Sequence, residues 1–217
     1  MRKGYIFDFD GTLADTFLDS LIAFNKSLIE YDVDTFHIND LENVSYVDFR
    51  NFAHRLEDNA DNLPIKDIQL AYRRNSLESK RYHTELYPGI RDVLKTLKDN
   101  GVSISICSNR DQILLDSLVD YLLGDIAFDC VVGYREGLPG KPDPYKLNRI
   151  IEKSNLDKDN VLYVGDRSAD ILTAENANVD MAFVTWGQKD DISMHCNYPL
   201  KMIDNAYDLL DIIERQV

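Results

Sequence analysis

The stretch GYIFDFDGT, residues 4–12, decides the fold because an apolar run ends there in two acidic residues. The run GYIF (4–7) is continuous rather than alternating, which is typical of a strand that is buried on both faces. Asp8 and Asp10 follow it at once. Two neighbouring carboxylates repel each other, and the end of a buried strand is an unfavourable place for either. The stretch therefore predicts a site in which an opposite charge offsets this repulsion.

Further apolar runs of the same kind recur along the chain, with helical patterns between them. The predicted strands cover residues 4–7, 102–107, 130–133, 161–165 and 181–185. Apolar residues at helical spacing predict helices over residues 88–100, 111–123, 144–154, 169–178 and 205–215. This alternation indicates an α/β protein with a Rossmann-like, doubly wound parallel sheet.

The segment from residue 16 to residue 85 breaks the alternation. It holds no convincing strand and instead shows helical patterns over residues 17–31, 46–57 and 64–83. A segment of this length is too long for a simple connection between two elements. We therefore expect a helical domain over 16–85, inserted into an α/β core made of 1–15 and 86–217.

Composition and charge exclude several classes of protein. The net charge is −14, from 38 acidic and 24 basic residues, which argues against a nucleic acid or an anionic membrane as partner. Cys107, Cys130 and Cys196 are widely spaced, so we expect neither a disulfide framework nor a zinc site. No apolar stretch has the length of a signal peptide or a membrane span, so we expect a cytoplasmic protein. The pattern does not predict an oligomeric state.

Polar residues gather where the predicted strands end. They are Asp8, Asp10, Ser108, Asn109, Lys141, Asp166 and Asp170. Ligands of an open parallel sheet bind beyond the carboxyl ends of its strands, so these side chains should meet. Three converging carboxylates, Asp8, Asp166 and Asp170, indicate a hard cation with oxygen ligands, and Mg²⁺ fits best.

The other polar groups suit a phosphoryl group. The Ser108 hydroxyl and backbone N–H groups at a helix start can bind phosphate oxygens, and Lys141 adds a positive charge. Asp8 and Asp10 face the same way if the segment is extended, so one could attack phosphorus while the other exchanges a proton. Each feature has a structural alternative when taken singly: a turn at Asp8–Gly11, a helix cap at Ser108, a surface lysine at Lys141. Their joint placement at successive strand ends favours a site.

These motifs resemble those of the haloacid dehalogenase-like superfamily of phosphohydrolases. DFDGT (8–12) is similar to its first motif, Ser108 to the second, Lys141 in GKPDP to the third and GDRSAD (165–170) to the fourth. The position of the helical insert is similar to that in the phosphoglycolate phosphatase and β-phosphoglucomutase branch. The resemblance implies a core that carries the chemistry and a helical cap that closes over it.

The resemblance also implies roles for the site residues. Asp8 would be the nucleophile that forms an aspartyl-phosphate, and Asp10 would be the acid and base. The implied Mg²⁺ ligands are Asp8, Asp10 through its backbone carbonyl, and Asp166, with Asp170 nearby. The phosphoryl group would be bound by Gly11, Thr12, Ser108, Asn109 and Lys141.

The expected function is therefore a Mg²⁺-dependent phosphatase acting on a small phosphorylated metabolite, such as phosphoglycolate, a sugar phosphate or a nucleoside monophosphate. Dehalogenases of the superfamily lack a carboxylate at the position of Asp10, so dehalogenation is not expected. A phosphosugar mutase of the β-phosphoglucomutase type is the main alternative. A non-enzymatic phosphoacceptor or ligand-binding domain is a further one, although it would not need Asp10. Candidate cap contacts are Ser45, Tyr46, Arg50, Arg73 and Arg74, and Arg167 is unusual within the fourth motif.

Overall fold

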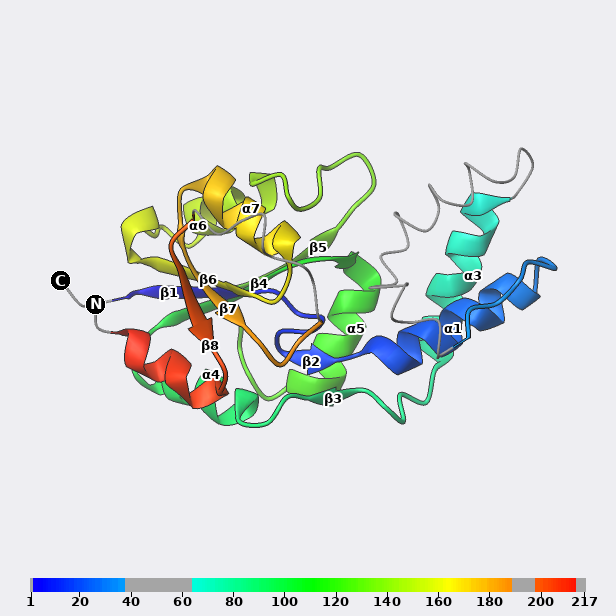
Figure 1. Cartoon of the computed structure of the whole chain (residues 1–217), viewed down its shortest axis with the longest axis horizontal. Coiled ribbons are helices and arrows are strands. Elements are labelled where there is room, and N and C mark those ends of the chain that lie inside the picture. Colours follow the sequence, from blue (N-terminus) through cyan, green and yellow to red (C-terminus); the bar gives the residue numbers. More distant parts are fainter. Residues whose placement is uncertain (1, 38–63, 189–197, 214–217) are drawn as a thin grey trace. The chain divides into compact units, whose positions relative to one another are not determined.

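The computed structural model describes residues 2–37, 64–188 and 198–213 (Figure 1). The chain divides into two compact units, one made of Met1–Asp15 and Glu85–Val217 and the other of Thr16–Thr84. The first unit, the core unit, contains a parallel sheet and its helices. The second, the helical unit, contains two helices among its described residues. That the helical unit acts as a cap stays a prediction.

The core unit is built on a six-stranded parallel sheet. Its strands are β1 (Gly4–Phe7), β4 (Ser103–Asp111), β5 (Cys130–Tyr134), β6 (Val161–Gly165), β7 (Asp180–Val184) and β8 (Leu200–Ile203). They lie in the order β5-β4-β1-β6-β7-β8, with β5 and β8 at the two edges. Phe7 at the end of β1 pairs with Ile106 of β4 on one side and Val164 of β6 on the other. The chain segments that follow these three strands therefore leave the sheet next to one another.

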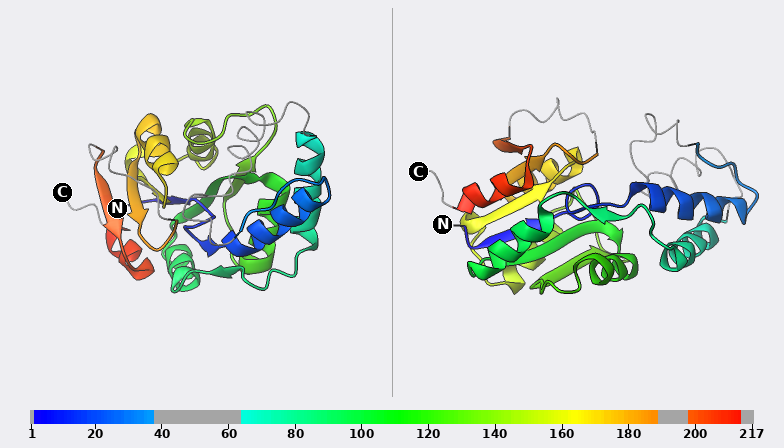
Figure 2. Two further views of the ribbon diagram at one scale, coloured as in Figure 1. Left: turned by 45° about the vertical axis from the view of Figure 1, so that its right-hand side comes forward. Right: turned by 90° about the horizontal axis from the view of Figure 1, so that it is seen from below.

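Helices cover both faces of this sheet (Figure 2). They are α4 (Ile90–Asp99), α5 (Gln112–Leu123), α6 (Tyr145–Lys153), α7 (Ser168–Ala177) and the 3-10 helix η4 (Ala206–Ile213). A short 3-10 helix, η2 (Lys158–Asn160), directly precedes β6. Tyr5 and Phe7 pack in the apolar cluster that includes α4, α5 and η4, while Ile6 packs in the cluster that includes α6 and α7. Successive residues of a strand are thus buried on opposite faces, which explains the continuous apolar runs in the sequence. The predicted fold class is confirmed.

The sequence and the structure differ at several elements. β4 continues to Asp111, beyond the predicted end at residue 107. The edge strand β8 and the short antiparallel pair β2 (Ala14–Asp15) and β3 (Glu85–Leu86) are not predicted. β8 exposes Lys201 and Met202, so it lacks the apolar run of a central strand. The predicted helix over 205–215 is a 3-10 helix over Ala206–Ile213.

The helical unit is organised around α1 (Phe17–Ile29) and α3 (Ile65–Glu78). The ring of Phe24 packs edge-on against that of Tyr72, with their centroids 5.8 Å apart. α3 ends earlier than predicted because Ser79 has extended backbone angles. The predicted helix over 46–57 lies outside the described residues. Among the residues that the structure describes, none of the helices combines the length and apolar character needed to cross a bilayer.

Candidate active site

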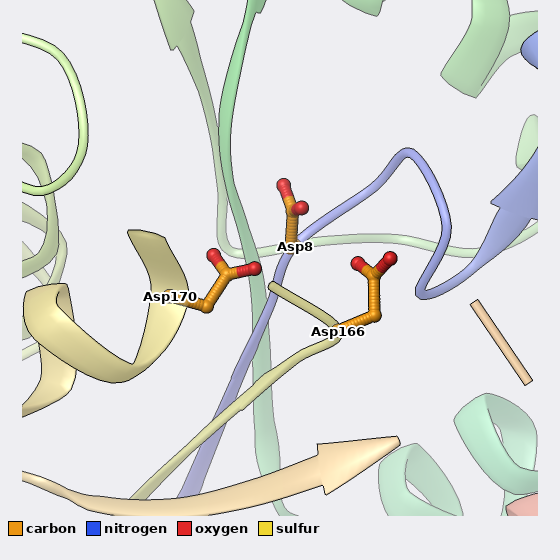
Figure 3. Close-up of side chains that lie close together, drawn as sticks. All are labelled: Asp8, Asp166 and Asp170. Carbon is orange, nitrogen blue, oxygen red and sulfur yellow. The ribbon is translucent and has the colours of Figure 1, made fainter. Parts of the chain in front are cut away.

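Three carboxylates meet at the carboxyl end of the sheet (Figure 3). Asp8 follows β1, Asp166 follows β6, and Asp170 lies in the first turn of α7. Each offers an oxygen, and these oxygens all lie within 4.8 Å of one another. The three residues are 5%, 0% and 1% exposed. The structure thus brings together the three acidic side chains that were predicted to meet at the carboxyl end of the sheet. We call them the carboxylate cluster.

Lys141 supplies the positive charge that contacts the carboxylate cluster. Its Nζ lies 2.7 Å from Asp8 Oδ1 and 2.6 Å from Asp170 Oδ1. The Lys141 side chain is only 4% exposed, so it is not an ordinary surface lysine. One ammonium group against three carboxylates leaves the cluster with an excess of negative charge.

Burial and this excess charge shift the pKa values of the cluster. Burial raises the pKa of Asp8 to about 7; Lys141 opposes that rise, and Asp170 adds to it. The pKa of Asp166 lies well above its usual value, because of burial first and then the charges of Asp8 and Asp170. Burial lowers the pKa of Lys141, but Asp170 and Asp8 raise it by more, so Lys141 stays positively charged. A bound dication would offset the remaining charge, and buried carboxylate oxygens are the donors that Mg²⁺ prefers. The residues therefore fit a magnesium ion.

The loop after β1 and the segment after β7 hold Asp166 in place. The Thr12 hydroxyl donates to Asp166 Oδ1 over 2.9 Å, and the backbone N–H of Gln188 donates to Oδ2 over 2.8 Å. Gly11 has a φ of 84°, and a Cβ atom there would lie 2.2 Å from Asp166 Oδ2. Only glycine fits this position. Both expected loop residues therefore lie against the cluster, with the Thr12 hydroxyl bonded to a carboxylate.

Asp10 points to a different partner from Asp8. β1 ends at Phe7, and the backbone then turns, with the N–H groups of Leu13 and Ala14 donating to the Phe9 carbonyl. The Asp10 carboxylate accepts hydrogen bonds from Arg110 Nε at 2.9 Å and Nη2 at 2.7 Å. The carboxylate cluster is made of Asp8, Asp166 and Asp170, and the Asp10 carboxylate pairs with Arg110 beside it. Its expected metal contact, through the backbone carbonyl, stays a prediction.

Arg110 is the partner that sequence analysis did not single out. Its side chain is 8% exposed and that of Asp10 is 6% exposed, so the ion pair is buried. The sequence feature from which it could have been predicted is its position directly after Ser108 and Asn109, on the strand that pairs with β1. A buried guanidinium fixes both the charge and the direction of the carboxylate that it contacts.

Ser108 and Asn109 lie in the continuation of β4. Ser108 is 1% exposed, and its hydroxyl accepts from the backbone N–H of Arg110. It is not the N-cap of α5, because Asp111 caps that helix. The Asn109 side chain joins two loops: its Oδ1 accepts from the Lys141 N–H at 2.8 Å, and its Nδ2 donates to the Lys141 carbonyl at 3.1 Å. Asn109 therefore sets the position of Lys141.

Two further buried side chains complete the surroundings. The Tyr163 hydroxyl donates to Asp170 Oδ1 over 2.8 Å. Lys146, in α6, is 2% exposed and donates to Asn109 Oδ1 over 2.9 Å and to the Ser108 carbonyl. Sequence analysis missed both. The signal for Lys146 was its place four residues before the buried Ile150, on the apolar face of its helix.

The remaining candidates are Arg167 in the core unit, two arginines of the helical unit, and three residues that the structure does not describe. Arg167 is the N-cap of α7, and its backbone N–H donates to Asp170 Oδ2 over 3.1 Å. Arg74 forms an ion pair with Glu30 inside the helical unit, and Arg73 is half-buried in α3. Three of the candidate cap contacts lie outside the described residues, namely Ser45, Tyr46 and Arg50.

Comparison with known proteins identifies the family. The profile of the family described as haloacid dehalogenase-like hydrolase matches residues 5–184. The chain is 28% identical to phosphoglycolate phosphatase 1 of Pseudomonas aeruginosa, over 94% of this chain and 77% of that protein. It is 31% identical to the phosphoglycolate phosphatase of Agrobacterium fabrum, over 85% and 81%. The fold is shared with CbbY from Rhodobacter sphaeroides in complex with phosphate, with a TM-score of 0.81 over 96% of each chain at 19% identity. The chain belongs to the haloacid dehalogenase-like hydrolases.

Proposed function

We propose that this protein is a Mg²⁺-dependent phosphatase that hydrolyses a small phosphomonoester through an aspartyl-phosphate at Asp8. The observation that carries the proposal is the buried carboxylate cluster with Lys141 in contact with two of its members. Relatives named phosphoglycolate phosphatase support a substrate of this size. Phosphoglycolate, sugar phosphates and nucleoside monophosphates are the candidates. A cytoplasmic location stays a prediction.

The carboxylate cluster is the proposed magnesium site. Asp8, Asp166 and Asp170 would offer side-chain oxygens, and Asp10 would offer its backbone carbonyl. Bound Mg²⁺ would neutralise part of the negative charge that phosphate and carboxylates share. Thr12 and the Gln188 N–H orient Asp166 as hydrogen-bond donors from outside the cluster.

In the first step, a carboxylate oxygen of Asp8 attacks phosphorus and the bond from phosphorus to the ester oxygen breaks. The departing oxygen takes a proton from Asp10, so an alcohol leaves and Asp8 carries the phosphoryl group. Arg110 holds the Asp10 carboxylate before the reaction, so Asp10 would leave this ion pair and take up a proton before it acts as the acid. Lys141 contacts Asp8, so its ammonium group can stabilise the negative charge that develops on the phosphoryl oxygens.

In the second step, water attacks phosphorus and gives its proton to Asp10. The bond from phosphorus to Asp8 breaks, orthophosphate is released, and the Asp8 carboxylate is restored. Ser108, Asn109, Lys141 and the Gly11 loop are the proposed phosphate-binding groups. In such reactions most of the rate gain comes from positioning and charge neutralisation.

The proposal is tested by release of phosphate from an aryl phosphate, measured with Mg²⁺ and with EDTA. We expect activity with Mg²⁺, none with EDTA and none in Asp8→Asn. Asp99→Asn is the matched control, because Asp99 is an exposed carboxylate at the end of α4. Equal activity in Asp8→Asn and wild type would contradict the proposal.

A panel of phosphorylated metabolites then identifies the substrate class. Each reaction is analysed for both free phosphate and the organic product. A phosphatase yields free phosphate and the dephosphorylated alcohol in equal amounts. Rearranged phosphosugar with little free phosphate would instead support the mutase alternative.

A further inference from the structure

Lys146 is a buried cation that the reaction as described does not use. It lies in the first turn of α6 and is 2% exposed. Placing an ammonium group in the interior is costly unless polar atoms replace its water. Its Nζ donates to Asn109 Oδ1 over 2.9 Å and to the carbonyl oxygen of Ser108. Both acceptors belong to the segment of β4 that is the proposed phosphate-binding segment.

Asn109 links Lys146 to the carboxylate cluster. The Asn109 side chain forms two hydrogen bonds with the backbone of Lys141: its Oδ1 accepts from the Lys141 N–H, and its Nδ2 donates to the Lys141 carbonyl. The Lys141 ammonium in turn contacts Asp8 and Asp170. Lys146 therefore holds the side chain that sets the position of Lys141. We call the Asn109–Lys141 contact the loop latch.

The charge of Lys146 also acts on Cys107, the residue of β4 before this segment. Burial raises the pKa of the Cys107 thiol, while Lys146 and, after it, Lys141 oppose that rise. Cys107 directly precedes Ser108. Both lysines thus make the potential at this segment more positive, although only Lys141 contacts the carboxylates of the cluster.

A cation on the Ser108 carbonyl has a consequence for the next N–H. The carbonyl of Ser108 and the N–H of Asn109 belong to one peptide group. Donation of a charged hydrogen bond to the oxygen polarises that group and makes its N–H a stronger donor. Backbone N–H groups are effective ligands of phosphoryl oxygens, so the effect favours an anion bound at this segment.

We propose that Lys146 is a positioning residue for phosphoryl binding: it fixes the loop latch and polarises the Ser108–Asn109 peptide toward a bound phosphate. The catalytic consequence rests on the proposed function, whereas the binding consequence is tested with orthophosphate alone. A lysine that only ties α6 to β4 would change stability and leave phosphate affinity as it is.

The test compares Lys146→Met with Lys158→Met. Lys158 also donates from Nζ to a backbone carbonyl, that of Ala177 at 2.7 Å, at the opposite end of α7 from Asp170. Orthophosphate affinity is measured by titration calorimetry with Mg²⁺ present, and kcat and KM with the aryl phosphate. We expect Lys146→Met to weaken orthophosphate binding by about 10-fold or more and to lower kcat. Lys158→Met should leave both within about 2-fold, because its hydrogen bond is remote from the phosphate.

Two further variants separate charge from folding. Lys146→Arg keeps the positive charge, and Lys146→Gln keeps only a neutral donor. We expect Lys146→Arg to bind orthophosphate more tightly than Lys146→Gln, and this pair decides the matter if Lys146→Met does not fold. Three outcomes would overturn the inference. Lys146→Gln could bind orthophosphate as tightly as wild type, Lys146→Met and Lys158→Met could lose equal affinity, or the wild-type protein could bind no orthophosphate. Wild-type protein that binds orthophosphate but hydrolyses no phosphate ester would contradict the proposed function alone.

Discussion

The core unit and the helical unit each bury acidic side chains, but they surround them differently. In the core unit, Asp8, Asp166 and Asp170 lie together with one ammonium group between two of them. In the helical unit, Asp19 is 8% exposed and accepts from neutral donors, the His83 N–H at 2.9 Å and the Thr84 hydroxyl at 2.7 Å.

This difference separates a structural arrangement from a functional one. The Asp19 contacts tie the start of α1 to the last residues of the helical unit, and each bond supports the fold. The carboxylate cluster does the opposite, because burial and mutual repulsion raise the pKa values of Asp8 and Asp166. A fold gains nothing from such repulsion, so a strongly shifted buried cluster indicates a functional site.

The largest expected effect comes from replacing one buried carboxylate in each unit, Asp8 in the carboxylate cluster and Asp19 in the helical unit. Asp8→Asn should lower kcat by about 1,000-fold or more, because the nucleophile is lost. It should not lower the free energy of unfolding of the metal-free protein, because one repelling charge is removed. Asp19→Ala should instead lower the free energy of unfolding by about 1–3 kcal/mol, since buried donors lose their acceptor.

Steady-state kinetics and urea unfolding of both variants check this contrast. If Asp8→Asn loses stability and keeps its activity, the cluster is structural and the comparison between the two networks fails.

The next effect concerns the close approach of the Gly11 loop to the cluster. A Cβ at Gly11 would lie 2.2 Å from Asp166 Oδ2, whereas one at Gly101 would have no heavy atom within 4 Å. Both residues have positive φ, 84° and 71°. Gly11→Ala should therefore reduce kcat by on the order of 100-fold through displacement of Asp166. Gly101→Ala carries only the backbone strain, about 1 kcal/mol, and should leave kcat unchanged.

Kinetics and thermal unfolding of this matched pair separate strain from displacement. Equal kcat values in the two variants would show that the approach of Gly11 to Asp166 is unimportant.

How far the sequence predicts this site depends on where each residue lies relative to a strand end. Asp8 and Asp166 could be placed together because their strands are parallel neighbours and their side chains directly follow them. Lys141 could be added because its loop follows β5 and therefore leaves the sheet at the same carboxyl end. The fold class followed from the same alternation, whereas the exposed edge strand β8 carried too weak a signal.

The residues that were missed reach the site by long side chains or from outside the strand ends. Arg110 contacts Asp10 with a long side chain from β4, the strand that pairs with β1. Lys146 reaches Ser108 from a helix on one face of the sheet. Such contacts depend on tertiary packing, and local sequence patterns do not determine it.

A smaller effect is expected from magnesium on the folded state. At 100 times its dissociation constant, Mg²⁺ should raise the free energy of unfolding of the wild-type protein by about 2.7 kcal/mol. Asp166→Asn should lose most of this stabilisation, whereas Asp19→Ala should keep it. Thermal unfolding at a series of Mg²⁺ concentrations measures all three. Identical Mg²⁺ responses in wild type and Asp166→Asn would place the ion elsewhere.

A further effect is a dependence of metal-free stability on pH. The pKa of Asp8 is raised from 3.8 to about 7 in the folded protein, mainly by burial. Between these values the folded state binds more protons than the unfolded state, so stability falls as pH rises. Unfolding of wild type and Asp8→Asn from about pH 4 to about pH 7 should show a steeper decline in wild type. Parallel curves would contradict a raised pKa at Asp8.

The most direct test of the central claim is to find the phosphoryl group on the protein. Enzyme is mixed with a phosphomonoester and Mg²⁺, quenched in acid and digested, and the peptide that contains Asp8 is analysed by mass spectrometry. With an aryl phosphate, whose leaving oxygen needs no proton, Asp10→Asn slows only the hydrolysis of the aspartyl-phosphate and should increase the trapped fraction, with Asp8→Asn as the negative control. We predict one added phosphoryl mass on Asp8. A phosphoryl group on another residue, or turnover with no labelled peptide in either active form, would contradict the assignment of Asp8 as nucleophile.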